Sequence, residues 1–483
     1  LLIKLVGRKM WLMRLRMDLW SLTVILISTL MLLPIGSLVV LSLGDSQGLW
    51  KHLIENVMLN YVTTTLTLMV GVLGLALIFG ISTAWIITRY DFALKNYIDL
   101  MLILPAACPA YLVAYAYTDF FEYAGPVQGI LRDISGWSNA SEYYFPEIRS
   151  VGGAIFVLAS VLYPYIFLLA RTAFLQTPKS LLDVNSIYGR SKFWNVSLPI
   201  ARPAIVAGSA LVCMEVVSDF GTVEYFSLET LTLGIFNVWI GMNNITAASQ
   251  IAISTFLFII ILLLVETRSR SEKRFHDTGR YQQQVYVEDA KNLKGLMLIT
   301  ICLVPVLCGF FIPVAILISN ISQFYNFSDF FRMLPALQNT ITVAALGSFI
   351  IVTIATFLAC TAVATEDKKL QNFANISAMG YAFPGTMLAI GVLITAGLVD
   401  RVLHNTLSNS YFYNKPFFIS GTIFVLLFAY LVRFLAVGYG ANISGLSKIS
   451  SNVNWASRTL SNSFAKTVYL LIISLRLFLS SSI

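Results

Sequence analysis

The sequence has 483 residues, of which 57% are hydrophobic and only 12% are charged, and its mean hydropathy is +0.78. Soluble globular domains carry about 25% charged residues. This composition excludes an ordinary soluble protein, and the formal net charge of +8 has to be explained by something other than a solvated surface. A lipid bilayer is the environment that suits so much apolar surface, and a helix needs about 20 apolar residues to cross it.

Ten apolar segments follow one another along the chain. They cover residues 20–43, 60–88, 100–118, 151–170, 203–220, 246–265, 295–320, 338–365, 373–399 and 416–432. Strands of membrane β-barrels are short and alternate apolar with polar residues, whereas these segments are long and apolar throughout. We therefore predict an all-α integral membrane protein with about ten transmembrane helices.

The basic residues are distributed unequally over the connections between these segments. With the N-terminus inside, the inner loops and tails hold 26 of the 32 Lys and Arg residues, and the outer loops hold 6. Cytoplasmic loops of membrane proteins are enriched in Lys and Arg. The basic stretch 1–19 is therefore predicted to be cytoplasmic, and the first apolar segment to be a retained span. The net charge reflects this topology, and no basic stripe interleaved with exposed aromatics indicates nucleic-acid binding.

Cysteine and histidine residues give no sign of a bound metal or cofactor. All five cysteines fall within apolar segments, none in a CxxC arrangement, and the three histidines are scattered in loops. Cysteine in such surroundings behaves as a small hydrophobic residue. We expect no disulfide, no metal cluster and no cofactor on this chain. The cysteines are Cys108, Cys213, Cys302, Cys308 and Cys360, and the histidines are His52, His276 and His404.

An internal repeat relates the two halves of the chain. Asn60 in NYVTTTLTLMVG corresponds to Asn339 in NTITVAALGSFI, and Pro105 corresponds to Pro384 in the following spans. Six spans separate the matching blocks, and an even number implies two copies with the same orientation, a parallel repeat. The predicted organisation is a basic N-terminus 1–19, a first repeat 20–265 with six spans, a cytoplasmic linker 266–294, and a second repeat 295–483 with four spans.

The most specific motif lies after the fourth segment, in SLLDVNSIYGRSKFWNVSLPIARPAIVAG, residues 180–208. It resembles the cytoplasmic loop of ABC importer permeases, which has Glu-Ala-Ala, then Gly, then Leu-Pro. In this resemblance the coupling loop is 178–203, and its signature positions are Asp183, Val184, Asn185, Gly189, Leu198 and Pro199. Glycine permits the positive φ of a tight turn, so we expect a short helix, a glycine turn and a second short helix.

Other stretches narrow the resemblance to the ferric-iron ABC permeases. These stretches are 111–137, 145–174, 218–242 and 274–282, and the similarity extends over nearly the whole chain. Thiamine permeases are similar too, so thiamine or another small solute stays an alternative substrate. The resemblance implies a multi-pass subunit of the bacterial inner membrane, with a periplasmic ferric-ion-binding protein and a cytoplasmic ABC ATPase dimer as partners. ATP and Mg²⁺ would be bound by the ATPase, so this chain would not itself be an enzyme.

Glu215 is the only acidic residue well inside an apolar segment, and Asp219 follows four residues later. An acid within the membrane is a hypothesis of function, and ferric iron requires hard oxygen ligands. On a helix Glu215 and Asp219 would share one face, and we predict that they line a translocation path, with Glu224 and Glu229 near its outer mouth. A hydrogen-bonded structural Glu215 is the alternative. The tyrosine-rich outer segment 111–147 is better explained by an aromatic belt and a docking surface than by iron ligation.

The second half departs from the family pattern. In its coupling loop, 447–475, the positions Trp455, Ala456 and Ser457 replace Glu-Ala-Ala, and Ser461 replaces the glycine. We interpret this loop as degenerate, and the second repeat as incomplete, because two further spans would be expected after the loop. A remnant with impaired transport is therefore a second hypothesis. A secondary transporter or channel is a third; it would need several titratable groups inside spans, and only Glu215 qualifies.

Overall fold

The computed structural model describes residues 2–271, 287–324, 327–365, 367–407, 419–447 and 464–481, with the single residues 457, 459 and 461. Apart from one pair of two-residue strands, the regular structure of this part of the chain is helical, which confirms the all-α membrane class. Within it, eight helical stretches are long and apolar enough to cross a bilayer. They are Leu19–Ser42, Met58–Arg89, Val151–Leu175, Phe193–Ser218, Asn292–Gln323, Phe330–Thr365, Gly385–Thr406 and Ile423–Leu446.

Two of the ten predicted spans are not among these eight stretches. The third, 100–118, corresponds to two helical stretches, Lys95–Ala107 and Ala110–Ser135, which meet at 90° and would make a ninth span if counted together. Pro109 lies at the break, where a proline lacks the N–H that would continue a helix. The sixth, 246–265, lies within a single helix, Ile245–Ser271, which includes the apolar stretch Ile245–Ile261.

The described chain packs as two compact units, one formed by residues 45–326 and the other by residues 1–44 with 327–483. The first predicted span therefore packs with spans of the predicted second repeat, and the span 295–320 packs with those of the first. Packing units and sequence repeats thus have different boundaries, and the repeat boundaries stay a prediction.

The unit 45–326 contains most of the described elements. Its helices up to residue 175 are α2 (Leu49–Asn56), α3 (Met58–Arg89), α4 (Lys95–Met101), η1 (Leu104–Ala107), α5 (Ala110–Phe121), α6 (Pro126–Ser135), η2 (Ala140–Glu142) and α7 (Val151–Leu175). Those that follow are α8 (Lys179–Ile187), η3 (Phe193–Ser197), α9 (Leu198–Ser218), α10 (Gly221–Tyr225), α11 (Leu231–Phe236), η4 (Asn237–Gly241), α12 (Ile245–Ser271), α13 (Asn292–Val306), η5 (Leu307–Phe311) and α14 (Ile312–Phe324).

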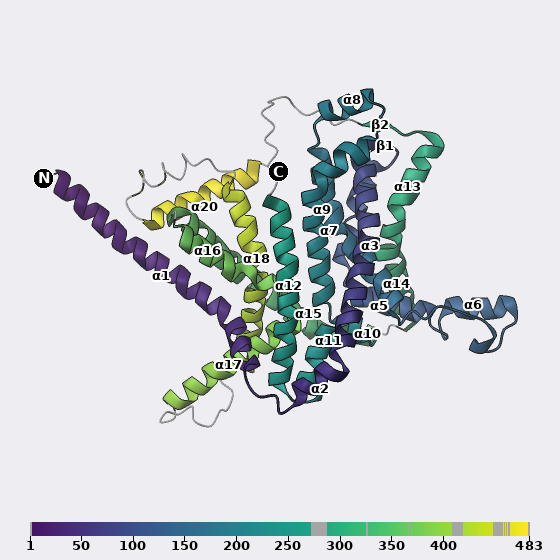
Figure 1. Ribbon diagram of the computed structural model, residues 1–483, viewed down its shortest axis with the longest axis horizontal. Coiled ribbons are helices and arrows are strands. Elements are labelled where there is room, and N and C mark those ends of the chain that lie inside the picture. The colour runs from purple at the N-terminus through teal and green to yellow at the C-terminus, as the bar shows by residue number, and fades with distance from the viewer. Residues whose placement is uncertain are drawn as a thin grey trace. The chain divides into compact units, whose positions relative to one another are not determined.

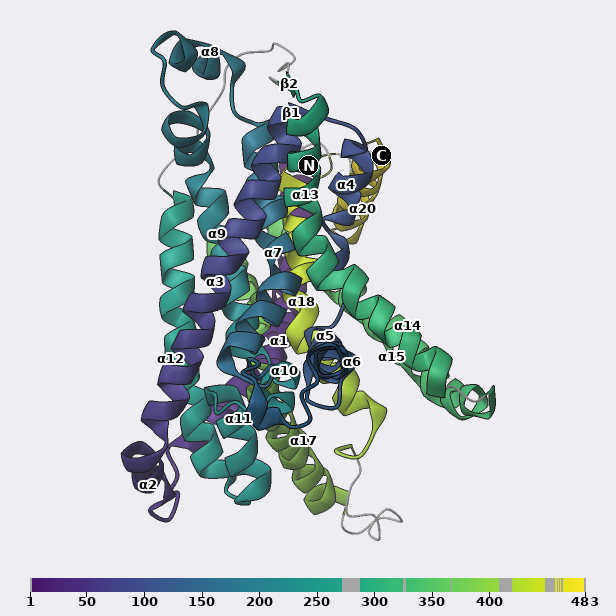
Figure 2. The ribbon, with the colours of Figure 1, turned by 90° about the vertical axis from the view of Figure 1, so that its right-hand side faces the viewer.

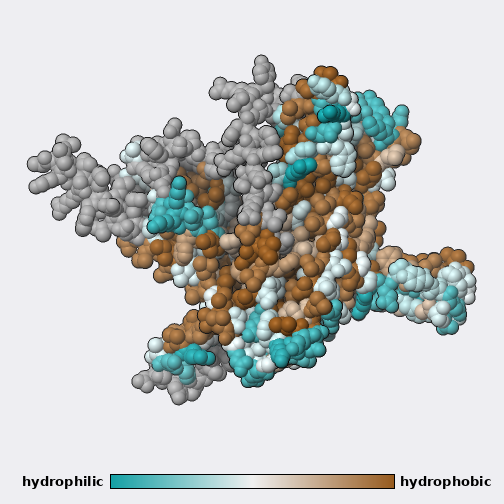
Figure 3. Space-filling view, in the orientation of Figure 1, coloured by the Kyte–Doolittle hydropathy of each residue, from teal (hydrophilic) through white to brown (hydrophobic). Residues whose placement is uncertain are grey.

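The centre of this unit is a close contact of α3, α7 and α9, which run side by side in Figures 1 and 2. Gly80 of α3 and Gly208 of α9 both face Ile166 of α7; a Cβ atom at Gly80 would lie 2.8 Å from the Ile166 Cβ. Small residues let helix backbones approach closely in membranes. Figure 3 shows hydrophobic side chains along the middle of this unit and hydrophilic ones around α8 and α2, as expected of a bundle that crosses a bilayer.

The α13–η5–α14 stretch is fixed to the same bundle. The Tyr117 hydroxyl of α5 donates a hydrogen bond to the Cys308 carbonyl at 2.6 Å, and a Cβ at Gly309 would lie 2.2 Å from the Ser160 carbonyl oxygen. Near α8, strands β1 (Tyr90–Asp91) and β2 (Glu288–Asp289) pair in parallel, and the Ala290 N–H donates to the Asp91 carbonyl. The end of the linker is thereby attached to the end of α3.

The unit formed by residues 1–44 and 327–483 has fewer elements. They are α1 (Leu2–Ser42), α15 (Phe327–Thr365), α16 (Lys368–Ser377), η6 (Ala378–Ala382), α17 (Gly385–Leu407), α18 (Ile423–Ser447) and α20 (Phe464–Ser481). The Ser37 hydroxyl of α1 donates to the Gly391 carbonyl of α17 at 3.1 Å. Between α15 and α18, Thr356 donates to Asn442 at 3.2 Å, and a Cβ at Gly438 would lie 2.9 Å from the Ala355 Cβ.

The structure changes one of the residue pairs that were matched between the two proposed repeats. Pro384 follows helix η6 and an extended Phe383, and its carbonyl accepts the first bonds of α17. Pro109 occupies the same place after η1 and an extended Cys108, and its carbonyl accepts from the Val113 N–H of α5. Pro384 is thus equivalent to Pro109. The match to Pro105 was wrong because identical letters were aligned without the short helix that precedes the proline.

Candidate functional site

The loop between α7 and α9 contains the predicted short helix and glycine turn. Helix α8 holds Asp183, Val184 and Asn185, and Gly189 follows it with φ of +62°. The Asn185 side-chain amide donates to the Arg190 carbonyl at 2.8 Å, and the Arg190 N–H donates to the Asn185 carbonyl at 3.3 Å. Because these two bonds enclose Gly189, Asn185 fixes the turn that only glycine adopts without strain.

The second limb of the loop differs from the predicted short helix. A single helical stretch runs from Phe193 to Ser218, so Leu198 and Pro199 lie within the start of a span. Proline is tolerated in the first turn of an α-helix, and residues 193–197 immediately before it form a π-helical turn that continues into α9.

Helix α8 presents an apolar surface that no other described part of the chain covers. It stands beyond the ends of α7 and α9 in Figure 1. Large hydrophobic side chains on it and beside it are exposed, and Ile187 is 83% exposed. Exposed apolar patches mark interaction sites. The residues concerned are Leu181, Val184, Ile187, Tyr188 and Trp194.

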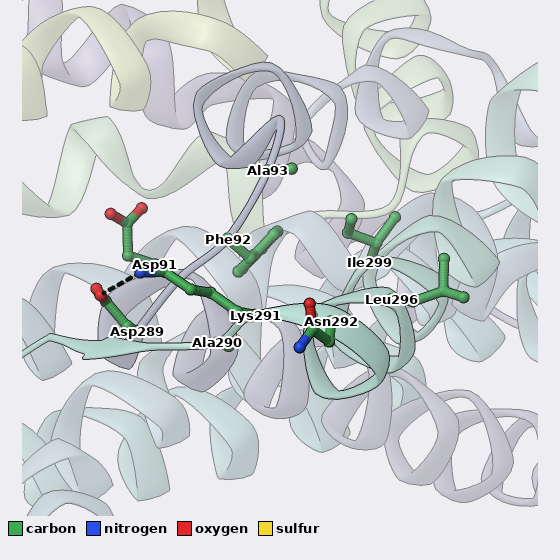
Figure 4. Close-up of a pocket in the computed structure, with 10 residues that line it drawn as sticks. Asp91, Phe92, Ala93, Asp289, Ala290, Lys291, Asn292, Leu296 and Ile299 are labelled. Carbon is green, nitrogen blue, oxygen red and sulfur yellow. Dashed lines mark ion pairs between the residues drawn. The ribbon is translucent and has the colours of Figure 1, made fainter.

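Charged residues surround the base of this loop. The Lys192 ammonium lies 3.2 Å from the Glu288 carboxylate on β2, and Lys294 lies 3.9 Å from the same side chain. Beside them is a pocket of about 740 Å³, drawn in Figure 4, in which Lys291 pairs with Asp289 at 3.4 Å. The linker strand therefore contacts the second limb of the loop.

Glu215 and Asp219 do not share a helical face, because α9 ends at Ser218. The Asp219 carboxylate accepts hydrogen bonds from the Thr222 and Val223 N–H groups at 3.0 and 3.2 Å and so caps α10. Asp favours such local backbone bonds over helical continuation. Glu215 lies half-buried in the last turn of α9, and Asp219 directly follows this helix, so both residues belong to the same end of the span.

Some of the outer acids and tyrosines make structural contacts. The Glu229 carboxylate accepts a hydrogen bond from the Asn60 amide. Tyr117 is buried, while Tyr143 donates to Gln128 at 2.6 Å. Among the described residues no group of three or more His, Cys, Asp or Glu side chains could hold a metal ion.

A pocket of about 780 Å³ lies between the end of α5, α6 and the segment before α7. The Arg149 guanidinium lies 2.6 Å from the Glu122 carboxylate there, and Arg132 covers the Tyr123 ring at 4.2 Å. Sequence reasoning missed both pairs. Each joins residues that are unremarkable in sequence: the reversal of the chain after α6 brings Arg149 to Glu122, and the turn before α6 brings Arg132 to Tyr123.

The second coupling loop is described at few positions. Trp455 and Ala456 lie outside the described residues. Ser457 and Ser461 are buried, and the Ser461 hydroxyl lies 2.5 Å from that of Thr467. Asn185 and Gly189, at the corresponding signature positions of the first loop, are half-buried and exposed, respectively.

The chain is similar to several permease proteins of transport systems. It is 23% identical over 421 residues to "Fe(3+)-transport system permease protein FbpB 2" of Haemophilus influenzae, covering 83% of this chain and 73% of that protein. It is 19% identical to "Ferric transport system permease protein FbpB" of Actinobacillus pleuropneumoniae, covering 82% of this chain and 58% of that protein. These similarities confirm the resemblance to ferric-iron permeases.

A shorter relative matches half of the chain. "Molybdate/tungstate transport system permease protein WtpB" of Methanocaldococcus jannaschii is 27% identical over 237 residues, covering 47% of this chain and 88% of that protein. No protein-family model matches the chain.

Proposed function

We propose that this chain is the membrane-spanning permease subunit of an ABC importer that moves ferric iron into the cytoplasm. The observation that carries the proposal is the α8 loop: a glycine-turned helix with exposed apolar residues, in a chain similar to ferric-transport permeases. Its partner there would be a cytoplasmic ATPase dimer, which binds ATP and Mg²⁺. The cell would be bacterial, the membrane its inner membrane, and the N-terminus cytoplasmic.

The position of the carboxylates supports a cationic substrate. Glu215, in the last turn of α9, and Asp219, directly after it, lie at the end of this span that is far from α8. A trivalent cation in a medium of low dielectric needs negative partners, whereas a molybdate or sulfate ion would be repelled by them. Ferric iron therefore fits this chain better than the oxyanions named for the shorter relatives. The pocket beside Arg149 and Glu122, at the same end of the unit, is our candidate docking surface for the periplasmic binding protein.

The proposal is tested by co-purification with a candidate ATPase encoded near the gene, followed by uptake of radiolabelled ferric citrate in cells that lack other iron systems. Binding of the ATPase together with iron uptake is the expected result. An ATPase that binds without iron uptake would point to thiamine or another solute. No bound ATPase would point to a remnant or to a transporter of another class.

The role of Glu215 is tested by Glu215→Gln, which keeps the shape of the side chain and removes its charge. We expect iron uptake to fall about tenfold or more, because the ferric ion would cross the membrane without this compensating negative charge, which is costly. Glu55→Gln is the control, since this exposed carboxylate lies in α2, outside the predicted path. Unchanged uptake by Glu215→Gln in a normally assembled complex would exclude an essential charge at this position.

A further inference from the structure

Arg89 is a buried cation at the end of α3, and no carboxylate pairs with it among the described residues. Its side chain is 4% exposed. One guanidinium nitrogen, Nη2, donates to the Phe174 carbonyl at 3.0 Å and lies 3.5 Å from the Ser197 hydroxyl. Taking a charge out of water without a counter-ion is costly, so this position requires a specific compensation.

The end of α7 provides that compensation. Phe174 is the penultimate residue of α7, and the last four carbonyls of a helix have no partner within it. These carbonyls form the negative end of the helix dipole, which favours a cation. The guanidinium also lies 5.2 Å from the centre of the Trp85 ring, close enough for a cation–π interaction.

Three aromatic rings enclose the contact. The Trp85 ring packs on Phe174 and on Phe193, with ring centres 5.5 and 5.0 Å apart, and the two phenylalanine rings are 6.3 Å apart. They come from α3, α7 and the second limb of the α8 loop. We call this cluster the arginine joint; its members are Trp85, Arg89, Phe174, Phe193 and Ser197.

Both ends of the α8 loop are held by this one cluster. The loop leaves the bundle after Leu175 and returns at Phe193. Phe174 stands at its departure, and Phe193 with Ser197 stand at its return. A displacement of α8 must therefore pull on the Arg89 side chain or break its contacts, and Arg89 belongs to a third span.

We propose that the arginine joint transmits displacement of α8 to the spans α3, α7 and α9, with Arg89 as its positioning residue. This inference rests on the proposed function, because α8 is displaced by a partner only if an ATPase binds there. Without the joint, ATP would still be hydrolysed on the partner, but closure of the ATPase would move α8 without moving the spans.

The test compares Arg89→Gln with Arg171→Gln in permease–ATPase complexes reconstituted in liposomes. Arg171 lies on α7, about one turn before Phe174, and its guanidinium pairs with the Asp99 carboxylate at 2.5 Å. It is therefore a matched arginine outside the joint. The readout is iron transported per ATP hydrolysed. We expect Arg89→Gln to lower this ratio about tenfold, a typical size for coupling between sites, and Arg171→Gln to leave it unchanged. An unchanged ratio in assembled Arg89→Gln would overturn the proposal.

Two further variants keep the test decisive if Arg89→Gln does not fold. Arg89→Lys keeps the charge but not the planar guanidinium, and we expect it to lower the ratio less. Phe193→Leu removes the aromatic contact on the loop side alone, and it should lower the ratio without affecting ATP hydrolysis. Normal ratios in both variants would also overturn the proposal.

Hydrogen–deuterium exchange of the isolated permease separates this inference from the proposed function. In Arg89→Gln we expect about tenfold faster exchange at residues 174–176 and 193–198, because a lost buried hydrogen bond eases local opening. Exchange in α12 should not change. If the wild-type complex transports nothing, the proposed function fails while this measurement still tests the joint; unchanged exchange at both segments would show that the joint does not hold the loop.

Discussion

The spans α7 and α15 each end beside a short helix, and their last carbonyls are satisfied in different ways. At the end of α7, Arg89 reaches across from α3 and joins three elements. At the end of α15, the Gln371 amide returns from the next helix, α16, to the Ala362 carbonyl at 3.0 Å, and Asp367 caps α16 through the Lys369 N–H. The first arrangement is long-range and carries a charge, whereas the second is local and neutral.

The difference follows from what each end has to hold. The α7 end anchors an exposed loop that the bundle itself does not cover, so a link to a third helix keeps both loop ends in place. The α15 end leads into a helix whose Leu370 and Ala374 are buried in their own unit. There apolar packing already fixes α16, and a local amide suffices. The buried cation thus lies at the helix end that, in the proposal above, transmits movement of α8 to the spans.

The largest expected effect concerns the close helix contacts that occur within each of the two units. Gly80→Leu would place side-chain atoms into Ile166, and Gly438→Leu into Ala355. Overpacking of this kind costs about 1–3 kcal/mol, sometimes more. We expect each variant to lower the midpoint of thermal unfolding in detergent by several degrees.

The controls are glycines on the same two helices. A Cβ at Gly74 of α3 or at Gly440 of α18 meets nothing within 4 Å, so Gly74→Leu and Gly440→Leu should leave the midpoint unchanged. If only Gly80→Leu lowered it, the two units would differ in packing as well as in their helix ends.

Gly189→Val tests the turn that gives α8 its position. Gly189 has φ of +62°, and a left-handed residue other than glycine costs about 1–2 kcal/mol, with a β-branched side chain among the worst. We expect weaker binding of the ATPase in pull-down titrations, while the unfolding midpoint of the bundle changes little. Asn tolerates this conformation, so Gly189→Asn should bind almost normally; equal loss in both variants would assign the effect to side-chain bulk.

Gln371→Ala examines the local counterpart of the arginine joint. Its removal leaves the Ala362 carbonyl without this donor, and such a hydrogen bond contributes about 1 kcal/mol. We expect a small fall in the unfolding midpoint and no change in iron transported per ATP. Asn372→Ala, at the exposed neighbouring position, is the control. A changed transport ratio in Gln371→Ala would mean that the α15 end also transmits force.

The spans and the glycine turn after α8 could be predicted from the sequence, but the burial of Arg89 at the end of α7 could not. The glycine turn was predicted from the resemblance of residues 180–208 to the cytoplasmic loop of ABC importer permeases, and the spans from the length of their apolar segments. Arg89 was assigned to an inner loop, since a basic residue directly after an apolar segment is typical of a cytoplasmic flank. Its burial depends on Phe174 and Ser197, which are 85 and 108 residues away, and no local pattern indicates such a contact.

The same reason explains the errors around the prolines and acids. Asp219 was placed on a helical face because spacing alone cannot show that it caps the next helix. A second short helix was expected around Leu198 and Pro199, but both residues lie at the start of a span, where proline is tolerated. In each case a neighbouring element decides the backbone conformation through which the side chain acts. The residue type therefore predicted the chemistry of the side chain but not its geometry.

The smallest expected effect concerns the ion pair at the base of the α8 loop. Lys192 and Glu288 are partly exposed, and such pairs contribute about 0–1 kcal/mol and weaken with salt. We expect Lys192→Gln to lower the unfolding midpoint slightly at low ionic strength and not at high ionic strength, and to lower iron transported per ATP much less than Arg89→Gln. A double-mutant cycle with Glu288→Gln isolates the pair, with Lys291→Gln as the control because Lys291 contacts Asp289 instead. A coupling as large as that of Arg89, and insensitive to salt, would mean that the linker strand rather than the buried arginine holds the loop.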